Sequence, residues 1–233
     1  GERTFSASFL GRFPDRTEHG MVVTWAAFGP SVIVMGGAGT DGTPLNDVWQ
    51  AYPTVAFFMW RQILANNPQD STRWCPRANA GMEALLDTLA RQVLIVTGGG
   101  SSTGILSDTW LSYDDGASWA AVDQDIPARA AFPVVAVNTT VLGEPTLSPN
   151  DTGRFYVLGG LVSPTLPQND VWMLSDPFNS TVEGPRWHLV LASTSANDTT
   201  RWAPRFSHGA VLLRDRMLVF GGSMDAAAIA PAF

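Results

Sequence analysis

The stretch "VLIVTGGGSSTGILSDTW", residues 93–110, contains the pattern that decides the fold. Its apolar run ends in a glycine pair, and an Asp-x-Trp triplet follows about ten residues later. The run is apolar at consecutive positions, which predicts a β-strand covered on both faces. Glycine suits the end of such a strand, because it allows a positive φ or the close approach of another strand.

The same pattern recurs along the chain with a period of about 62 residues. Four apolar runs end in glycine pairs, at Gly36 and Gly37, Gly98 and Gly99, Gly159 and Gly160, and Gly221 and Gly222. The first three pairs precede Asp-x-Trp triplets, which supply Asp47 and Trp49, Asp108 and Trp110, and Asp170 and Trp172. A proline and an arginine precede every pair and supply Arg16, Arg77, Arg129 and Arg205. This register predicts one domain over residues 1–233, with units at about 14–63, 74–123, 126–192 and 202–233.

Each unit is predicted to contain four short strands with turn residues between them. In the second unit these strands lie near residues 79–87, 92–97, 108–113 and 118–122. The repeated aspartates are expected to accept backbone N–H bonds from the turn before their strand. The repeated tryptophans are expected to be largely buried between neighbouring sheets.

The four repeated arginines allow two interpretations. They could form an anion-binding ring at one mouth of a central channel, because each begins the strand nearest to the axis. Alternatively, each guanidinium bonds the aspartate of its strand or a carbonyl of the adjacent unit. A residue repeated in every unit is more often structural, so the second interpretation is favoured.

Taken together, "RTEHG" (16–20), "VIVMGG" (32–37), "NDVW" (46–49), "RFSHG" (205–209) and "MLVFGG" (217–222) resemble the kelch repeat family of β-propellers. The resemblance covers essentially the whole chain. It implies an all-β fold of four-stranded antiparallel blades, about four in this chain. They would form a closed four-bladed ring or part of a larger one. Residues 3–13 are expected to pair with 205–233 and close the ring within one chain, with strands exchanged between chains of a fibre as an alternative.

The second unit also contains "SYDDGASW", residues 112–119, which resembles the Asp-box of sialidases and other propellers. In that family Asp114 would accept hydrogen bonds from turn N–H groups and Gly116 would take the left-handed position. Ser112 completes the pattern, and Trp119 would pack between sheets. The resemblance predicts a corner between strands rather than a binding site, and the other units depart from the pattern.

Composition excludes several classes of function. The net charge of −7 and the absence of lysine argue against binding to nucleic acid or an anionic membrane, and against lysine chemistry. Cys75 is the only cysteine, so neither an internal disulfide nor a cysteine metal cluster can form. No apolar run reaches the length of about 18 residues that a membrane-spanning helix needs.

Four N-glycosylation sequons point to the secretory pathway. They begin at Asn138, Asn150, Asn179 and Asn197, in or next to the third unit. Long polar loops with several acceptors are expected to face solvent. The sequence therefore predicts an extracellular or cell-surface protein whose partners bind elsewhere.

The sequence contains no complete set of catalytic or metal-binding residues. His19 and His208 occupy equivalent positions, but a stable metal site needs three or four ligands. The resemblance to galactose-oxidase-like enzymes would require paired tyrosines and a Cys–Tyr crosslink, and nothing pairs with Cys75. A sialidase would require a Tyr/Glu pair, and only Glu18 and Glu83 could lie on inner strands. No catalytic residue, metal or cofactor is therefore predicted.

These observations predict a non-catalytic extracellular scaffold, adhesion or assembly module of a surface or secreted glycoprotein. Its expected partners are other proteins or copies of itself, and possible further partners are glycans. The first alternative is a carbohydrate-active enzyme resembling a sialidase or galactose oxidase, or a fragment of one. The second is a lectin-like module that binds glycans through loop tryptophans.

Overall fold

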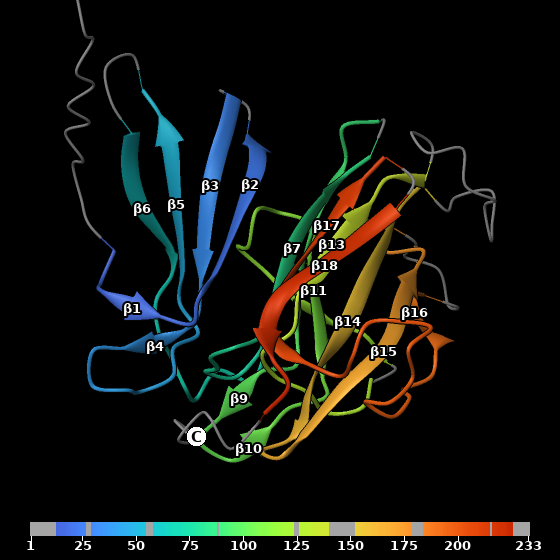
Figure 1. The fold of residues 1–233 in the computed structure, drawn as a ribbon. Coiled ribbons are helices and arrows are strands. Elements are labelled where there is room, and N and C mark those ends of the chain that lie inside the picture. The colour runs from blue at the N-terminus through green and yellow to red at the C-terminus, as the bar shows by residue number, and fades with distance from the viewer. Residues whose placement is uncertain are drawn as a thin grey trace, which may run out of the picture.

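The computed structural model of the 233-residue chain describes residues 13–26, 29–54, 58–87, 89–123, 126–139, 152–178, 184–214 and 216–225. The fold is all-β, as predicted, and its main elements are antiparallel sheets (Figure 1). The strand positions predicted for the second unit agree with the observed ones to within two or three residues.

Within the described residues three sheets have four strands each, and every one follows the chain order with each strand antiparallel to the next. The first sheet consists of β2 (Gly20–Ala26), β3 (Gly29–Met35), β5 (Val48–Pro53) and β6 (Phe58–Leu64). The second consists of β7 (Gly81–Leu86), β8 (Gln92–Thr97), β11 (Thr109–Ser112) and β12 (Ala120–Ala121). The third consists of β13 (Val134–Val137), β14 (Arg154–Ser163), β15 (Leu166–Ser175) and β16 (Arg186–Leu191).

The fourth sheet has two strands in the described part of the chain, β17 (Phe206–Leu213) and β18 (Arg216–Ser223). Two short strand pairs complete the sheets found in the described part of the chain. They are β1 (Arg16–Thr17) with β4 (Ala38–Gly39), and β9 (Gly100–Ser101) with β10 (Gly104–Ile105).

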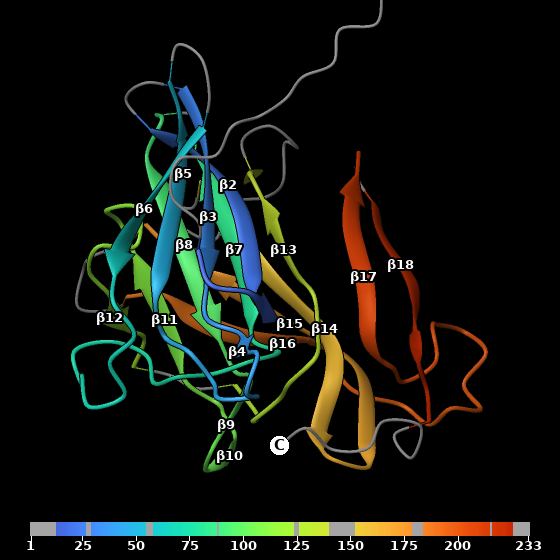
Figure 2. The same cartoon turned by 90° about the vertical axis from the view of Figure 1, so that its left-hand side faces the viewer.

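The sheets stack face to face in chain order, with their first strands side by side (Figure 2). Strand β7 contacts both β2 and β13, and β17 contacts β13 and β14. We call the face of a sheet that is directed at the next sheet its forward face, and the opposite one its backward face. Apolar side chains from one forward face and one backward face form each core, as Val22 does with Met82 between the first two sheets. The second and third sheets are thus covered on both faces, which explains the consecutive apolar residues of β8 and β14, whereas the sheet of β3 has a neighbouring sheet on its forward face.

A series of backbone hydrogen bonds links each unit to the next one along the chain. Glu18, Asn79, Ala131 and Ser207 each lie two residues after a repeated arginine, and all four have φ between 50° and 58°. The N–H of Asn79 donates to Glu18, that of Ala131 to Asn79, and that of Ser207 to Ala131, at 3.1, 2.9 and 2.8 Å. A left-handed conformation at these non-glycine residues is costly and persists only where the surrounding structure requires it. Here the repeated hydrogen bond between units is the constraint that holds these residues in the left-handed conformation.

The glycine pairs make the second link between units. The N–H groups of Gly37, Gly99 and Gly160 donate to the repeated arginine of the next unit, at Arg77, Arg129 and Arg205, over 2.9, 2.7 and 3.0 Å. Gly99 has a φ of +96°, and a Cβ there would lie 2.8 Å from the carbonyl oxygen of Ala78. A side chain would therefore be excluded both by conformation and by space.

The sheets do not close into a ring within the described parts of the chain. The backward face of the first sheet and the forward face of the fourth remain exposed, as Met21 and Val211 show. Residues 3–12 and 226–233 lie outside the described residues, so closure through residues 3–13 stays a prediction. Phe13, at the end of that segment, stacks on Trp60 of the first sheet with ring centroids 4.6 Å apart.

Candidate functional site

The repeated arginine, aspartate and tryptophan side chains meet in each of the first three units. Arg16 donates two hydrogen bonds to Asp47, at 2.6 and 2.8 Å. The equivalent bonds from Arg77 to Asp108 measure 2.7 and 2.8 Å, and those from Arg129 to Asp170 measure 3.1 and 2.9 Å. The indole N–H of Trp49, Trp110 and Trp172 donates to the same carboxylates at 2.7, 2.7 and 2.8 Å.

Each guanidinium in these clusters also holds the backbone of its own unit. Arg129 donates from Nη1 to the carbonyl oxygen of Gly159 at 3.1 Å and from Nε to that of Pro127 at 3.1 Å. The side chains of Arg16, Arg77 and Arg129 are fully buried. Their planar donors are directed at a carboxylate and two carbonyl groups, which is the bidentate recognition that arginine favours.

Arg205 occupies the same position in the fourth unit without an aspartate partner in the described residues. It donates to the carbonyl oxygens of Gly221 and Ala203, at 2.7 and 3.1 Å. The chain has alanine or proline where the triplet aspartate would fall, near residues 231 and 232. The backbone bonds are therefore kept where the ion pair is absent.

The pKa of the Asp108 carboxyl group is set by its contact with Arg77. Burial acts to raise the pKa of its carboxyl group, but hydrogen bonds from Arg77 and the charge of that guanidinium outweigh burial. The pKa is therefore lowered and the carboxylate stays ionised.

The tryptophans of the triplets are only half-buried, although they occupy equivalent positions on the backward faces of their sheets. The prediction of large burial was too strong, because the indole N–H must reach an aspartate near the sheet end. Trp74, Trp119 and Trp187 are the buried ones. Trp74 was not singled out from the sequence, although "DSTRW" (70–74) recurs as "DTTRW" (198–202).

The turn at 112–119 is held by its own side chains. Asp114 accepts hydrogen bonds from the backbone N–H and the hydroxyl of Ser118, at 2.8 and 2.6 Å. The N–H of Gly116 donates to Ser112 Oγ at 2.9 Å, and the φ of Gly116 is +87°. Trp119 is buried and packs edge-on against Trp74 with centroids 5.8 Å apart. The acidic side chain is used inside the turn.

His19 and His208 occupy equivalent positions beside the second glycine of their pairs, where the other units have Ala80 and Phe132. No group of three or more histidine, cysteine, aspartate or glutamate side chains within the described ranges is arranged to hold a metal ion. Burial, followed by the charge of Arg205, lowers the pKa of His208 to about 4. This imidazole is neutral near pH 7.

Buried His208 should make the fold acid-sensitive. Unfolded histidine has a pKa near 6.5, so the unfolded chain binds a proton first as the pH falls. The free energy of unfolding should drop between pH 6.5 and 4, by about 3 kcal/mol at most for this group, and this loss should not grow below pH 4. His208→Phe, which copies Phe132, should flatten this drop in urea titrations at pH 7 and 5. The exposed His188→Phe should not, and equal profiles for all three proteins would contradict the assignment.

Glu83 lies on β7 at a position where the other units have Val22, Val135 and Val211. Its carboxylate accepts the N–H of Ala84 at 2.8 Å, and burial raises its pKa. No tyrosine is hydrogen-bonded to it in the described structure. Tyr52 and Tyr113 instead donate to Met59 Sδ and to the carbonyl oxygen of Pro177.

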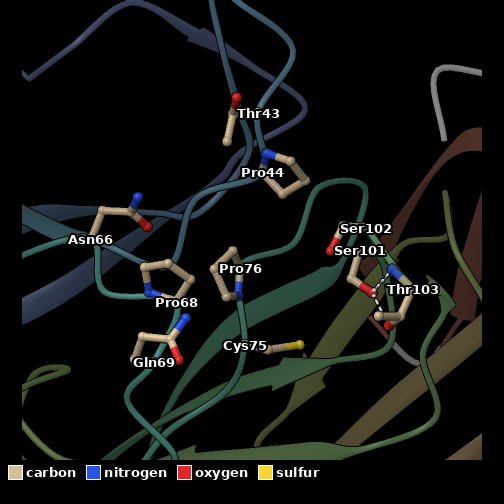
Figure 3. A pocket seen from close by; sticks show the side chains of 10 residues that line it. All are labelled: Thr43, Pro44, Asn66, Pro68, Gln69, Cys75, Pro76, Ser101, Ser102 and Thr103. Atoms are coloured by element: carbon tan, nitrogen blue, oxygen red, sulfur yellow. Dashed lines mark hydrogen bonds between the residues drawn. The ribbon is translucent and has the colours of Figure 1, made fainter.

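A cavity of about 390 Å³ opens between the first two units at the end that carries the glycine pairs. Figure 3 shows its lining, which comes from the loop before β5, the segment after β6 and the β9–β10 turn. The ten lining residues carry hydroxyl, amide, proline and thiol groups and no charge: Thr43, Pro44, Asn66, Pro68, Gln69, Cys75, Pro76, Ser101, Ser102 and Thr103. Ser101 and Thr103 hydrogen-bond each other at 2.9 Å. The lining is uncharged, and most of its exposed surface is apolar.

Comparison with protein-family models and with curated proteins finds no match to this chain. Among the described residues no helix has both the length and the apolar character needed to cross a membrane.

Proposed function

We propose that this chain is a non-catalytic extracellular β-propeller module of the kelch type that acts as a scaffold, adhesion or assembly unit. The observation that carries the proposal is the threefold Arg–Asp–Trp cluster. The charged and polar side chains of this cluster recur in three units, where they bond one another and the backbone and so hold strands together. The module then offers surfaces to partners rather than a reaction centre.

The stacked sheets support the propeller architecture. Their first strands lie side by side, and one forward face covers one backward face at each of three interfaces. The same backbone bond steps from Glu18 to Ser207 in four units. Sheets that repeat one step around their first strands are the construction principle of a propeller.

Enzyme assays separate this proposal from the carbohydrate-active alternative. Tyr52, Tyr113 and Cys75 are each engaged with a different neighbour, and Cys75 Sγ lies 3.4 Å from Arg77 Nη2. We expect neither sialic acid release from sialylated oligosaccharides nor peroxide formation from galactose in the presence of copper. Turnover of either substrate would favour the enzyme alternative.

Glycosylation tests the extracellular setting. Asn197 lies exposed in a turn, whereas Asn138 is half-buried and its amide donates to the carbonyl oxygen of Leu86 at 3.0 Å. A glycan on Asn138 would have to replace that bond, and Asn150 and Asn179 lie outside the described residues.

Secretion from a eukaryotic host should therefore give a protein with N-glycan on Asn197. Asn197→Gln should lower the intact mass by one glycan, and the matched Asn138→Gln should change it little. Deglycosylation followed by mass spectrometry measures both. A secreted protein with all four asparagines bare would contradict the extracellular part of the proposal.

Glycan binding is the second candidate, because the cavity is uncharged and combines apolar surface with the hydroxyl and amide groups of residues such as Thr43, Asn66 and Ser102. A glycan array of the wild-type chain, with Ser101→Tyr to fill the cavity, tests it. Binding that the substitution abolishes would move the function toward a lectin-like module. No binding would leave the scaffold proposal as it stands.

A further inference from the structure

The two ends of the stack expose apolar side chains whose equivalents at the internal interfaces are buried or partly buried. On the forward face, Val211 is 46% exposed, whereas its equivalents Val22 and Val135 are 4% and 5% exposed. Phe220 is 54% exposed, and its equivalents Met35 and Leu158 are 0% and 2% exposed. The fourth unit therefore has apolar residues at the positions that form the interfaces between units, but the described chain has no further sheet to cover them.

The backward face of the first sheet is open in the same way. Met21, Val23 and Trp25 of β2 are 67%, 64% and 59% exposed. In the next unit the equivalent Met82 and Ala84 pack on Val22 and Ile33 of the preceding sheet. Exposed apolar clusters of this kind mark interaction surfaces.

We infer that these two faces bind each other between copies of the chain, with the forward face of β17–β18 docked head to tail on the backward face of β2. The inference rests on the propeller architecture proposed above and names its assembly partner as a second copy. One free forward face and one free backward face make the association heterologous, which can continue from copy to copy.

The apolar side chains at the two ends support this pairing. A Cβ on Gly20 would collide with Met82, because that methionine fills the space left by the glycine. The residues equivalent to Gly20 and Met82 at the open ends are Gly209 and Met21. At Gly209 the exposed Phe220 ring of the same chain lies where a Cβ would be, so Met21 of a second copy would pack on that ring.

The backbone provides the matching polar groups. In the described chain the bond series begins at Glu18 and ends at Ser207, and continuation would join the Glu18 N–H to the Ser207 carbonyl oxygen of the second copy. The glycine series would continue from the Gly222 N–H to the carbonyl oxygen of Arg16. The contact thus extends an interface that the chain already makes three times.

Paired variants test the inference by analytical ultracentrifugation over a range of concentrations. Leu218 is paired with Val211 across β17 and β18 and is 44% exposed. Wild-type chain should associate beyond the monomer, and Val23→Asp or Leu218→Asp should weaken this association roughly tenfold or more. Leu189→Asp is the matched control, because Leu189 is equally exposed on β16, away from both faces. It should associate like wild type.

Mixing the variants gives the decisive result. Val23→Asp keeps its forward face and Leu218→Asp keeps its backward face, so an equimolar mixture should form a one-to-one dimer that neither forms alone. A monomeric wild type would overturn the inference and indicate that the ends are covered within one chain. Variants that each self-associate like wild type would overturn it as well. A monomer that is secreted with glycans would leave the proposed function intact.

Discussion

Arg129→Met should lower the free energy of unfolding by about 3–5 kcal/mol, because it leaves a buried carboxylate without its counter-ion. Arg129 is fully buried and Asp170 nearly so, and two hydrogen bonds join them. Removal also frees the carbonyl oxygens of Gly159 and Pro127. Urea unfolding followed by tryptophan fluorescence measures the loss.

Arg205→Met is the matched control. Arg205 makes the same backbone bonds, is only half-buried, and has no carboxylate partner in the described structure. Its loss should be clearly smaller than that of Arg129. Equal losses would mean that the ion pair contributes nothing beyond the carbonyl bonds.

Trp74→Ala should also cost about 3–5 kcal/mol, as a large-to-small change in a packed core. Trp74 is completely buried between the first two sheets, among Val22, Met35 and Val96, and meets the edge of Trp119. The cavity would lie between sheets that are joined there mainly by apolar contacts.

Trp110→Ala gives the comparison within the same core. Trp110 is half-buried and contacts the core from its edge, so its truncation should cost less than that of Trp74. From the repeated Asp-x-Trp pattern alone, Trp110→Ala would be expected to cost about 3–5 kcal/mol, as for a buried tryptophan. A larger loss at Trp110 than at Trp74 would contradict the observed burial.

The strands and glycine pairs could be predicted because the signal is local and repeated. In a run such as "VLIVTGG" the consecutive apolar residues indicate a buried strand and the glycine pair indicates where it ends. Four copies of the run show the spacing of the units. The pairing of Arg77 with Asp108 was one of two interpretations of a repeated residue. Geometry, not sequence, places the guanidinium between the carboxylate and Gly98.

Other features carry no local signal. Asn79 and Ala131 have left-handed backbones although neither sequence position contains glycine, because the constraint is a hydrogen bond to the preceding unit. The burial of Trp74 depends on the neighbouring sheet. Ring closure depends on contacts between distant segments, for which a repeat supplies the interface but not the number of units.

Amide hydrogen exchange measured by NMR tests the central claim, that one backbone bond steps through equivalent positions of all units. The amides of Asn79 and Ala131 lie outside the strands, so ordinary loop positions there would exchange rapidly. Both amides, together with that of Ser207, should exchange as slowly as amides of the central strands. Rapid exchange at Asn79 and Ala131, with protection confined to the strands, would contradict the repeat on which the fold and the proposals are built.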